Sequence, residues 1–251
     1  MKLIYAKDYQ QMSAAAARLL AAQVIEKPGA VLGLATGGTP VGTYRELVRL
    51  CREGLVSFRG VHTVNLDEYC GLSGEHPQSF RYFMNENLFS KVDVLPENTY
   101  IPDGIAKDGV AECRRYEELV SRLGPVDLQV LGIGSNGHIG FNEPDQVFSK
   151  GVVYTSLTDD TVRANARFFD RVEDVPTSAY TMGIDVIMRA RRLLLLANGQ
   201  GKAEIMYKAL CGPITPAVPA SALQLHRDLT VIVDEAAGEV LKDHGCEGEV
   251  L

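Results

Sequence analysis

The sequence predicts an α/β fold in which a mostly parallel sheet is covered by helices on both faces. Short apolar runs typical of buried strands alternate with segments in which apolar residues recur at helical spacing. The chain has 251 residues, 46% of them hydrophobic, which is enough for a sizeable core. It contains no Pro- or Ser-rich linker, low-complexity tract or repeat, so we expect one domain over residues 1–251.

The first helix and strand set the pattern. Apolar residues keep helical spacing from Met12 to Val24, and Pro28-Gly29 ends that helix before the compact run AVLGLA, a predicted strand over 30–35. The alternation continues with helices expected near 40–54, 79–90 and 109–123, and strands near 61–66, 127–133, 192–197 and 228–233. Such alternation is typical of parallel strands that are buried on both faces.

The segment 145–180 is the least regular part of the chain and is rich in charged and β-branched residues. It follows a motif with candidate catalytic residues. We therefore expect either a mobile lid over the site or an ordinary surface excursion, and the sequence leaves both open.

Composition excludes several classes of partner. A net charge of −7 and a pI near 5.3 argue against a broad nucleic-acid surface, which needs clustered Lys and Arg, but they allow a local pocket for a small anion. No apolar stretch reaches transmembrane length and the first apolar run is too short for a signal peptide, so no membrane association is expected. Five widely separated cysteines suggest reduced thiols in a cytoplasmic protein.

A glycine-rich turn, Thr36-Gly37-Gly38-Thr39, follows the first predicted strand. We expect Thr39 to be the N-cap and Pro40 the first residue of the next helix. Backbone N–H groups at a helix N-terminus, two glycines and two hydroxyls can form a cradle for a phosphate. The turn matches neither GxxxxGK[ST] nor GxGxxG, which disfavours a nucleoside triphosphate or a dinucleotide. A plain strand-to-helix turn is the alternative.

An acidic pair, Asp67-Glu68, follows the apolar Val64 and Leu66 in VNLDEY, at the expected end of a strand. Partial desolvation raises the pKa of a carboxyl group, which makes Asp67 a candidate base for removing a proton beside a carbonyl or imine. The alternative is a helix-capping Asp with a solvated Glu.

The run LGIGSNGHIGFNEP places His138 and Glu143 five residues apart in a glycine-rich segment after an apolar strand. A Glu can orient a His that acts as general acid or base, and Asn136 adds a neutral amide. One His with one Glu does not fill a zinc shell, so no metal is expected. Ser135 has no G-x-S-x-G elbow around it, which argues against a serine hydrolase.

Two cations are candidate partners for a phosphate. Arg167 in TVRANARFF could bind it in bidentate fashion, and Lys202 in NGQGKAEI could add a second charge. Most surface Arg and Lys side chains are simply solvated, which is the alternative for each.

Taken in order, LATGGTP, NLDEY, LGIGSNGHIGFNEP, ANARFF, GQGKA and SALQLH resemble the glucosamine-6-phosphate deaminase family over nearly the whole chain. The resemblance implies a Rossmann-like, doubly wound α/β fold with its site at the carboxyl ends of the strands. It also implies conversion of glucosamine 6-phosphate and water to fructose 6-phosphate and ammonia, without a cofactor.

The resemblance further implies a role for each motif. His138, steered by Glu143 and Asn136, would open the sugar ring, and Asp67 would move a proton from carbon 2 to carbon 1 through an enolamine. A ketimine would follow, and attack by water would release ammonia. The phosphate would rest on the loop from Thr36 to Thr39, with Arg167 and Lys202 as counter-charges.

Two departures from the family pattern matter. Many members carry Asp where this chain has Asn136, which can hydrogen-bond the imidazole but adds no charge, so more of the support falls on Glu143. The chain also ends soon after its last predicted strand and helix, whereas allosteric hexameric members have a longer tail. We therefore expect a monomer or a small homo-oligomer.

Two competing functions remain. The related 6-phosphogluconolactonases have an Arg after the Asp-Glu pair and lack FNEP, whereas this chain has Tyr69 and keeps FNEP, which favours the deaminase. A catalytically silent sugar-phosphate sensor is the other alternative. No helix-turn-helix segment with a basic recognition helix precedes the domain, so we expect an enzyme.

Overall fold

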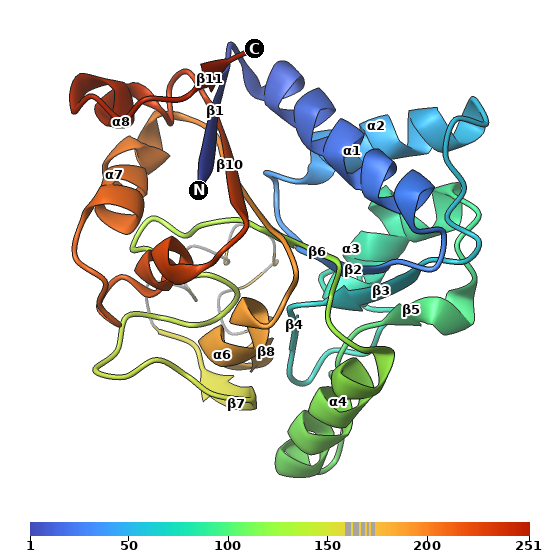
Figure 1. Cartoon of the computed structure of the whole chain (residues 1–251). Helices are drawn as coiled ribbons and strands as arrows, with labels where there is room; N and C mark the ends of the chain where they lie inside the picture. The colour runs from blue at the N-terminus through green and yellow to red at the C-terminus, as the bar shows by residue number, and fades with distance from the viewer. Residues whose placement is uncertain (159–161, 163–165, 167–168, 170, 172–173) are drawn as a thin grey trace.

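A computed structural model describes residues 1–158, 162, 166, 169, 171 and 174–251. Its main feature is an eight-stranded sheet in the order β11-β1-β10-β9-β6-β2-β3-β5, in which every neighbouring pair is parallel (Figure 1). The strands are β1 (Lys2–Ala6), β2 (Val31–Leu34), β3 (His62–Asn65), β5 (Thr99–Tyr100), β6 (Leu128–Leu131), β9 (Leu193–Ala197), β10 (Leu229–Asp234) and β11 (Glu249–Val250).

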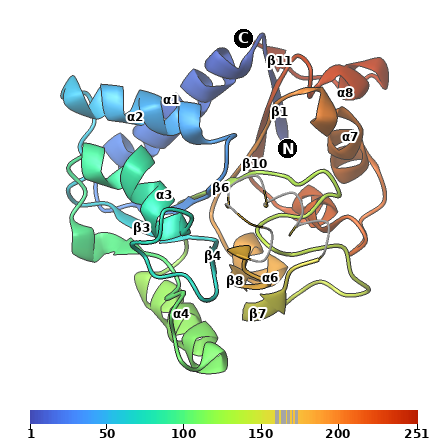
Figure 2. The ribbon, with the colours of Figure 1, turned by 180° about the vertical axis from the view of Figure 1, so that it is seen from behind.

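Helices cover this sheet, and each helix predicted from the sequence is present. They are α1 (Tyr9–Glu26), α2 (Val41–Arg52), α3 (Phe80–Asn87), α4 (Gly109–Leu123), α6 (Ile184–Met188), α7 (Ala203–Cys211) and α8 (Glu239–Asp243), with 3-10 turns η1 (Phe89–Lys91), η2 (Pro96–Asn98), η5 (Gln200–Lys202) and η6 (Pro219–Leu225). Seen from behind, α7 and α8 lie on the side of β10, whereas α2 and α3 lie on the side of β3 (Figure 2).

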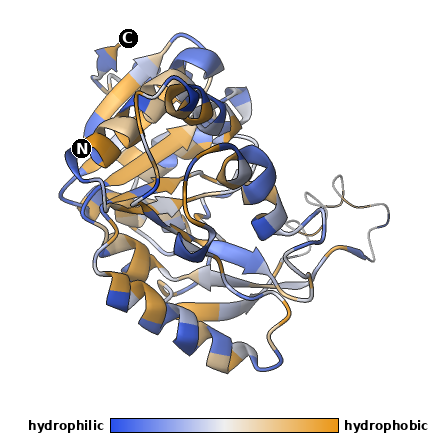
Figure 3. Ribbon diagram, turned by 90° about the vertical axis from the view of Figure 1, so that its right-hand side faces the viewer, coloured by the Kyte–Doolittle hydropathy of each residue, from blue (hydrophilic) through white to orange (hydrophobic). Residues whose placement is uncertain are grey.

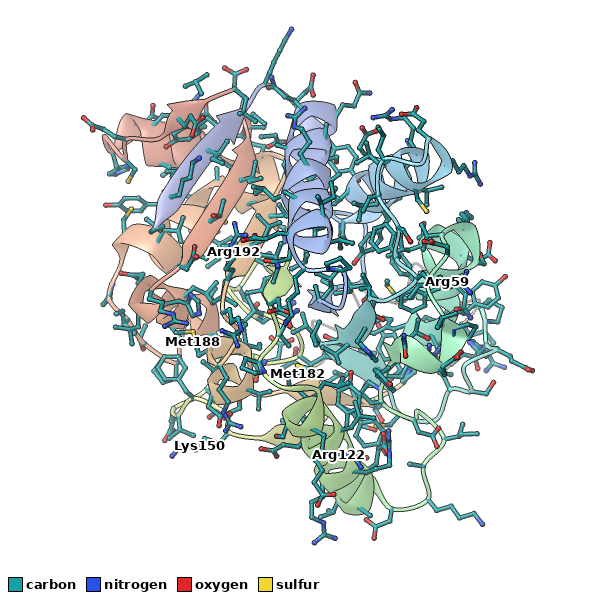
Figure 4. The ribbon with its side chains drawn as sticks, turned by 45° about the vertical axis from the view of Figure 1, so that its right-hand side comes forward. Arg59, Arg122, Lys150, Met182, Met188 and Arg192 are labelled. Atoms are coloured by element: carbon teal, nitrogen blue, oxygen red, sulfur yellow. The ribbon has the colours of Figure 1, made fainter. Side chains whose placement is uncertain are left out.

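The core lies between the sheet and its helices. Every residue of β2, β6, β9 and β10 is buried, as expected for strands with both faces covered. The strands are largely apolar, whereas the helices carry apolar and polar stripes (Figure 3). Arg192, just before β9, donates to Gln23 of α1 over 3.4 Å (Figure 4). The prediction of an α/β fold with a mostly parallel sheet is confirmed. No helix among the described residues combines the length and apolar character needed to cross a membrane.

A second, antiparallel sheet was not predicted. It has the order β4-β8-β7 and consists of β4 (Asp67–Tyr69), β8 (Ser178–Met182) and β7 (Val152–Ser156). Figures 1 and 2 show it at the lower end of the molecule, near α4 and α6. Asp67 therefore begins a separate strand and does not end β3, which corrects the expected placement. The segment 145–180 contributes β7 and part of β8, and some of its residues lie outside the described set.

The order of the strands fixes where a ligand should bind. From β2 the chain adds β3 and β5 on one side, and from β6 it adds β9 and β10 on the other, so the sheet is doubly wound. The direction in which successive strands are added to the sheet reverses between β2 and β6. These two strands pair through Leu32–Leu128 and Gly33–Gln129. Doubly wound sheets bind ligands outside the carboxyl ends of the strands at such a point. The loops after β2 and β6 carry two of the motifs singled out from the sequence.

Candidate active site

The loop after β2 is open to solvent and held at its edges. Gly37 has φ of 96°, a conformation that favours glycine, and a Cβ built on Gly37 or Gly38 would meet no atom within 4 Å. The phenol of Tyr9 donates to the Gly38 carbonyl oxygen over 3.0 Å and accepts from the Gly42 N–H over 2.8 Å. A ligand can therefore approach this backbone closely, because the two glycines have no side chains and the space beside them is open.

The expected helix cap is wrong. Helix α2 begins at Val41, and its N-cap is Pro40, which has helical φ and ψ and no capping side chain. The Thr39 hydroxyl instead donates to Asn198 Oδ1 over 2.8 Å. The Val41 N–H already contacts the Gly38 carbonyl oxygen, and the Gly42 N–H is bonded to Tyr9. An anion here would rest on the Thr36–Thr39 loop more than on the first turn of α2.

The acidic pair on β4 is buried. Asp67 is 6% exposed and Glu68 is 1% exposed, which excludes a solvated Glu68. The Glu68 carboxylate accepts the backbone N–H groups of Tyr69, Phe80 and Arg81 over 2.8, 2.8 and 2.9 Å. Because Phe80 and Arg81 form the first turn of α3, Glu68 fastens the strand that carries Asp67 to the start of that helix.

Burial sets the electrostatics of this pair. It raises the pKa of Asp67 to about 8, and the neighbouring charge of Glu68 adds to this effect. Burial also raises the pKa of Glu68, to about 7, although the three N–H groups and the charge of Arg81 act in the opposite direction. A carboxyl group with such a pKa can both take and return a proton near neutral pH.

The imidazole of His138 lies in the glycine-rich loop after β6. Its Nδ1 is 3.4 Å from Glu143 Oε1, and a Cβ at Gly134 would lie within 2.4 Å of the ring, so a side chain there would displace it. The His138 side chain is 26% exposed and that of Glu143 is 11% exposed. The loop thus holds a partly accessible imidazole against a carboxylate.

Asn136 supports Glu143 and the backbone of the loop. Its Nδ2 donates to Glu143 Oε2 over 2.6 Å, and its Oδ1 accepts the His138 backbone N–H over 3.2 Å. A carboxylate only accepts and a backbone N–H only donates, so these partners fix the orientation of the amide. Among the described residues, His138 Nδ1 has no hydrogen-bond partner, so the bond that Asn136 could make to the imidazole is not formed at this nitrogen. The charged neighbour of the imidazole is Glu143.

Strand β8 joins the two halves of the site. It pairs with β4 so that Thr181 lies opposite Asp67, and its Thr181 hydroxyl accepts the Phe141 N–H over 3.1 Å. The Asn142 amide donates to the carbonyl oxygen of Met182, which Figure 4 labels, over 2.9 Å. A Cβ at Gly140 would lie 3.4 Å from Asp67 Oδ2. The structure therefore brings Asp67 against the loop that carries His138 and Glu143. Sequence reasoning missed Thr181, which stands in no recognisable motif.

Of the two predicted cations, the structure describes Lys202 but not Arg167. Lys202 is the last residue of η5 and the N-cap of α7, in the loop after β9, and it is half-buried. Arg167 lies outside the described residues, so its predicted contact with phosphate stays a prediction. Within the described part of the chain, no group of three or more His, Cys, Asp and Glu side chains is placed to hold a metal ion.

Comparisons with known proteins relate the whole chain to one family. A family model described as glucosamine-6-phosphate isomerases/6-phosphogluconolactonase matches residues 6–232. The glucosamine-6-phosphate deaminase of Lachnoclostridium phytofermentans is 55% identical over 232 residues, which cover 92% of this chain and 98% of that protein. The corresponding protein of Clostridium perfringens is 50% identical over 242 residues, which cover 96% and 100%.

Solved structures give the same result. One described as a monomeric glucosamine-6-phosphate deaminase of the NagB superfamily has a TM-score of 0.93 at 50% identity, covering 96% of this chain and all of that one. A 6-phosphogluconolactonase from Thermotoga maritima has a TM-score of 0.75 at 20% identity, covering 94% and 100%, which shows a shared fold.

Proposed function

Because the chain belongs to the family of glucosamine-6-phosphate isomerases and 6-phosphogluconolactonases, we propose that it is a glucosamine-6-phosphate deaminase. It converts glucosamine 6-phosphate and water to fructose 6-phosphate and ammonia. The observation that carries this proposal is that a buried carboxyl group, Asp67, lies against Gly140, in the same loop as the His138–Glu143 pair. Identity of 50–55% with proteins named as this deaminase supports it.

The reaction begins with ring opening. His138 passes a proton between the anomeric hydroxyl and the ring oxygen, and Glu143 stabilises the imidazolium because its carboxylate lies beside Nδ1. Asn136 holds Glu143 in place through its amide. The partial exposure of the imidazole lets it exchange protons with water between turnovers.

Asp67 then acts on the open-chain sugar. Its carboxylate removes the proton from carbon 2, and the carbonyl oxygen at carbon 1 gains a proton from the substrate ammonium at carbon 2, which gives an enolamine. Asp67 returns its proton to carbon 1, and carbon 2 becomes a ketimine. Water adds to carbon 2 and ammonia leaves, which yields the ketone of fructose 6-phosphate. The substrate ammonium at carbon 2 would lower the pKa of Asp67 in the complex and favour the base form.

The phosphate of the sugar binds at the other end of the site. We place it on the Thr36, Gly37, Gly38 and Thr39 loop, where the backbone is open, with Lys202 and Arg167 as counter-charges.

No cofactor takes part. The protein acts as a single domain, as a monomer or small homo-oligomer, in the cytoplasm, where a phosphorylated sugar is retained because its charge opposes membrane crossing. Sedimentation of the purified protein tests the assembly.

The test of the function is production of ammonia and fructose 6-phosphate from glucosamine 6-phosphate, with hydrolysis of 6-phosphogluconolactone measured in parallel. Stoichiometric formation of both products is the expected result. Hydrolysis of the lactone alone would replace the proposal with the sister activity. Binding of sugar phosphate without either reaction would replace it with a sensor.

A further inference from the structure

The loop after β9, residues 198–202, is held on both sides by side chains to which the proposed reaction gives no role. On one side, Asn198 Oδ1 accepts the Thr39 hydroxyl over 2.8 Å. On the other side, both carboxylate oxygens of Asp234 accept the Gly199 N–H over 3.0 Å. Gly199 has φ of 86° and is the N-cap of the turn η5, which ends at Lys202.

The hydrogen bond between Thr39 and Asn198 spans the point where the direction of strand addition reverses. Strand β6 lies between β2 and β9 in the sheet, so the loops after β2 and β9 meet over the carboxyl end of β6. Two loops that are not neighbours in the sheet are thereby joined. One of them is the open Thr36–Thr39 loop and the other carries Lys202.

Asp234 anchors the far end of this connection. Val233 pairs with Ala197, so Asp234 lies at the carboxyl end of β10 directly beside the start of the 198–202 loop. The carboxylate is 8% exposed and also accepts the Ala237 N–H over 2.8 Å. A buried carboxylate is stable only when donors surround it, and here those donors are the backbone of the loop and of the turn that follows β10.

We propose that Asn198 and Asp234 are positioning residues for phosphate recognition, which together fix the Lys202 loop against the Thr36–Thr39 loop. This rests on the proposed function, in which both loops contact the phosphate of the sugar. The Lys202 backbone N–H donates to the Gly199 carbonyl oxygen over 3.0 Å, so holding Gly199 also holds the turn that presents Lys202. Preorganised loops bind an anion more tightly because less conformational entropy is lost on binding.

The test compares Asp234→Asn and Asn198→Ala with the wild type. Loss of a hydrogen bond to a charged group predicts that KM for glucosamine 6-phosphate and the dissociation constant of inorganic phosphate both rise about tenfold in Asp234→Asn. The value of kcat should change less than about threefold, because Asp234 does not contact the reacting carbons. Calorimetry with inorganic phosphate gives the affinity independently of turnover.

The control is Asp127→Asn. Asp127 is also a buried carboxylate, but it lies at the amino edge of the sheet, where it accepts the Val31 N–H and pairs with Lys27. We expect this variant to lose stability and keep the wild-type affinity for phosphate. Equal weakening of phosphate binding in both variants would reduce Asp234 to a general structural role and overturn the inference.

A double-mutant cycle tests the bridge itself. If Asn198 acts through Thr39, Asn198→Ala should weaken phosphate binding in the wild type but have little further effect in Thr39→Val. Additive effects would overturn this part of the inference.

The positioning role and the deaminase function would fail in different ways. An active enzyme whose Asp234→Asn variant binds phosphate normally contradicts the positioning role alone. A wild type that releases no ammonia, but whose affinity for phosphate falls in Asp234→Asn and Asn198→Ala, contradicts the deaminase alone. A wild type that binds neither phosphate nor sugar phosphate contradicts both.

Discussion

The large and small sheets hold their candidate catalytic groups in opposite environments. In the loop after β6 of the large sheet, the His138 side chain is 26% exposed. On β4 of the small sheet, Asp67 is 6% exposed and its carboxyl group is enclosed by the His138 loop and β8. Each environment suits the step proposed for it. A ring-opening acid–base gives back the proton that it takes, so contact with water does it no harm, whereas a base that carries the substrate's own proton between two carbons is helped by shielding from water.

The difference predicts the fate of the substrate proton. A proton taken from carbon 2 by a buried carboxyl group has little access to water before it is delivered to carbon 1. We therefore expect part of a deuterium label at carbon 2 of the substrate to appear at carbon 1 of the product. The environments differ for a structural reason, because the loop lies outside the sheet edge while β4 is covered by β8 and α3.

Removing the buried base should have the largest effect. Asp67→Asn keeps the size of the side chain but cannot take a proton, so we expect kcat to fall by about 10³-fold or more. Binding of inorganic phosphate should stay within about twofold of the wild type, because the phosphate site lies on other loops. Exchange of the carbon 2 proton, followed by NMR, is the measurement. Exchange at the wild-type rate would remove Asp67 from its proposed role.

Removing the accessible group should have a smaller effect. His138→Gln keeps a hydrogen-bonding side chain but cannot shuttle a proton, and we expect turnover of the cyclic sugar to fall by about 10²-fold. An open-chain analogue needs no ring opening, so its turnover should be slowed less. Steady-state rates on both substrates test this. Equal slowing of both would place His138 in a later step.

The two regions also differ in how far the sequence revealed them. The strands of the large sheet are continuous apolar runs such as LLLLA in β9, and their pattern is local. The small sheet has no such signal. Its strand β4 has three residues, and Asp67 pairs with Thr181, far away in the chain. Tertiary pairing, and not local propensity, creates this sheet.

The same division applies to the site. His138, Asn136 and Glu143 stand within one short motif, so their spacing alone predicted that they meet. The partners of Glu68 could not be predicted, because one of them, the Phe80 N–H, lies 12 residues further along and belongs to a helix end. The Thr39 hydroxyl was expected to cap a helix, but its acceptor, Asn198, lies 159 residues away.

Burial of Asp67 should make stability depend on pH. Its pKa in the folded protein, about 8, is above the ordinary value, so its favourable contribution is fully present below about pH 4 and is lost as pH rises through about 8. Relative to Asp67→Asn, the wild type should therefore lose about 4 kcal/mol of unfolding free energy between pH 5 and pH 9, most of it below pH 8. Urea denaturation of both proteins at the two pH values measures this. A constant difference would mean that Asp67 is better solvated than its burial indicates.

The smallest effect should come from the neighbour of Asp67. Glu68→Gln removes the charge that helps to raise the pKa of Asp67, so Asp67 should titrate at lower pH. This decrease in pKa should be smaller than the increase that burial causes, because burial is the larger cause. Carboxyl-carbon NMR of Asp67 is the measurement.

The amide nitrogen that Glu68→Gln introduces cannot accept the Arg81 N–H, so the same variant should also lose about 1 kcal/mol of stability. The matched control is Glu112→Gln, which alters a buried Glu of α4 that is bonded to the Asp103 N–H. It should lower stability and leave the titration of Asp67 unchanged. If both variants shift that titration equally, the effect comes from loosening of the fold and not from the charge beside the base. The contrast between the two regions would then rest on burial alone.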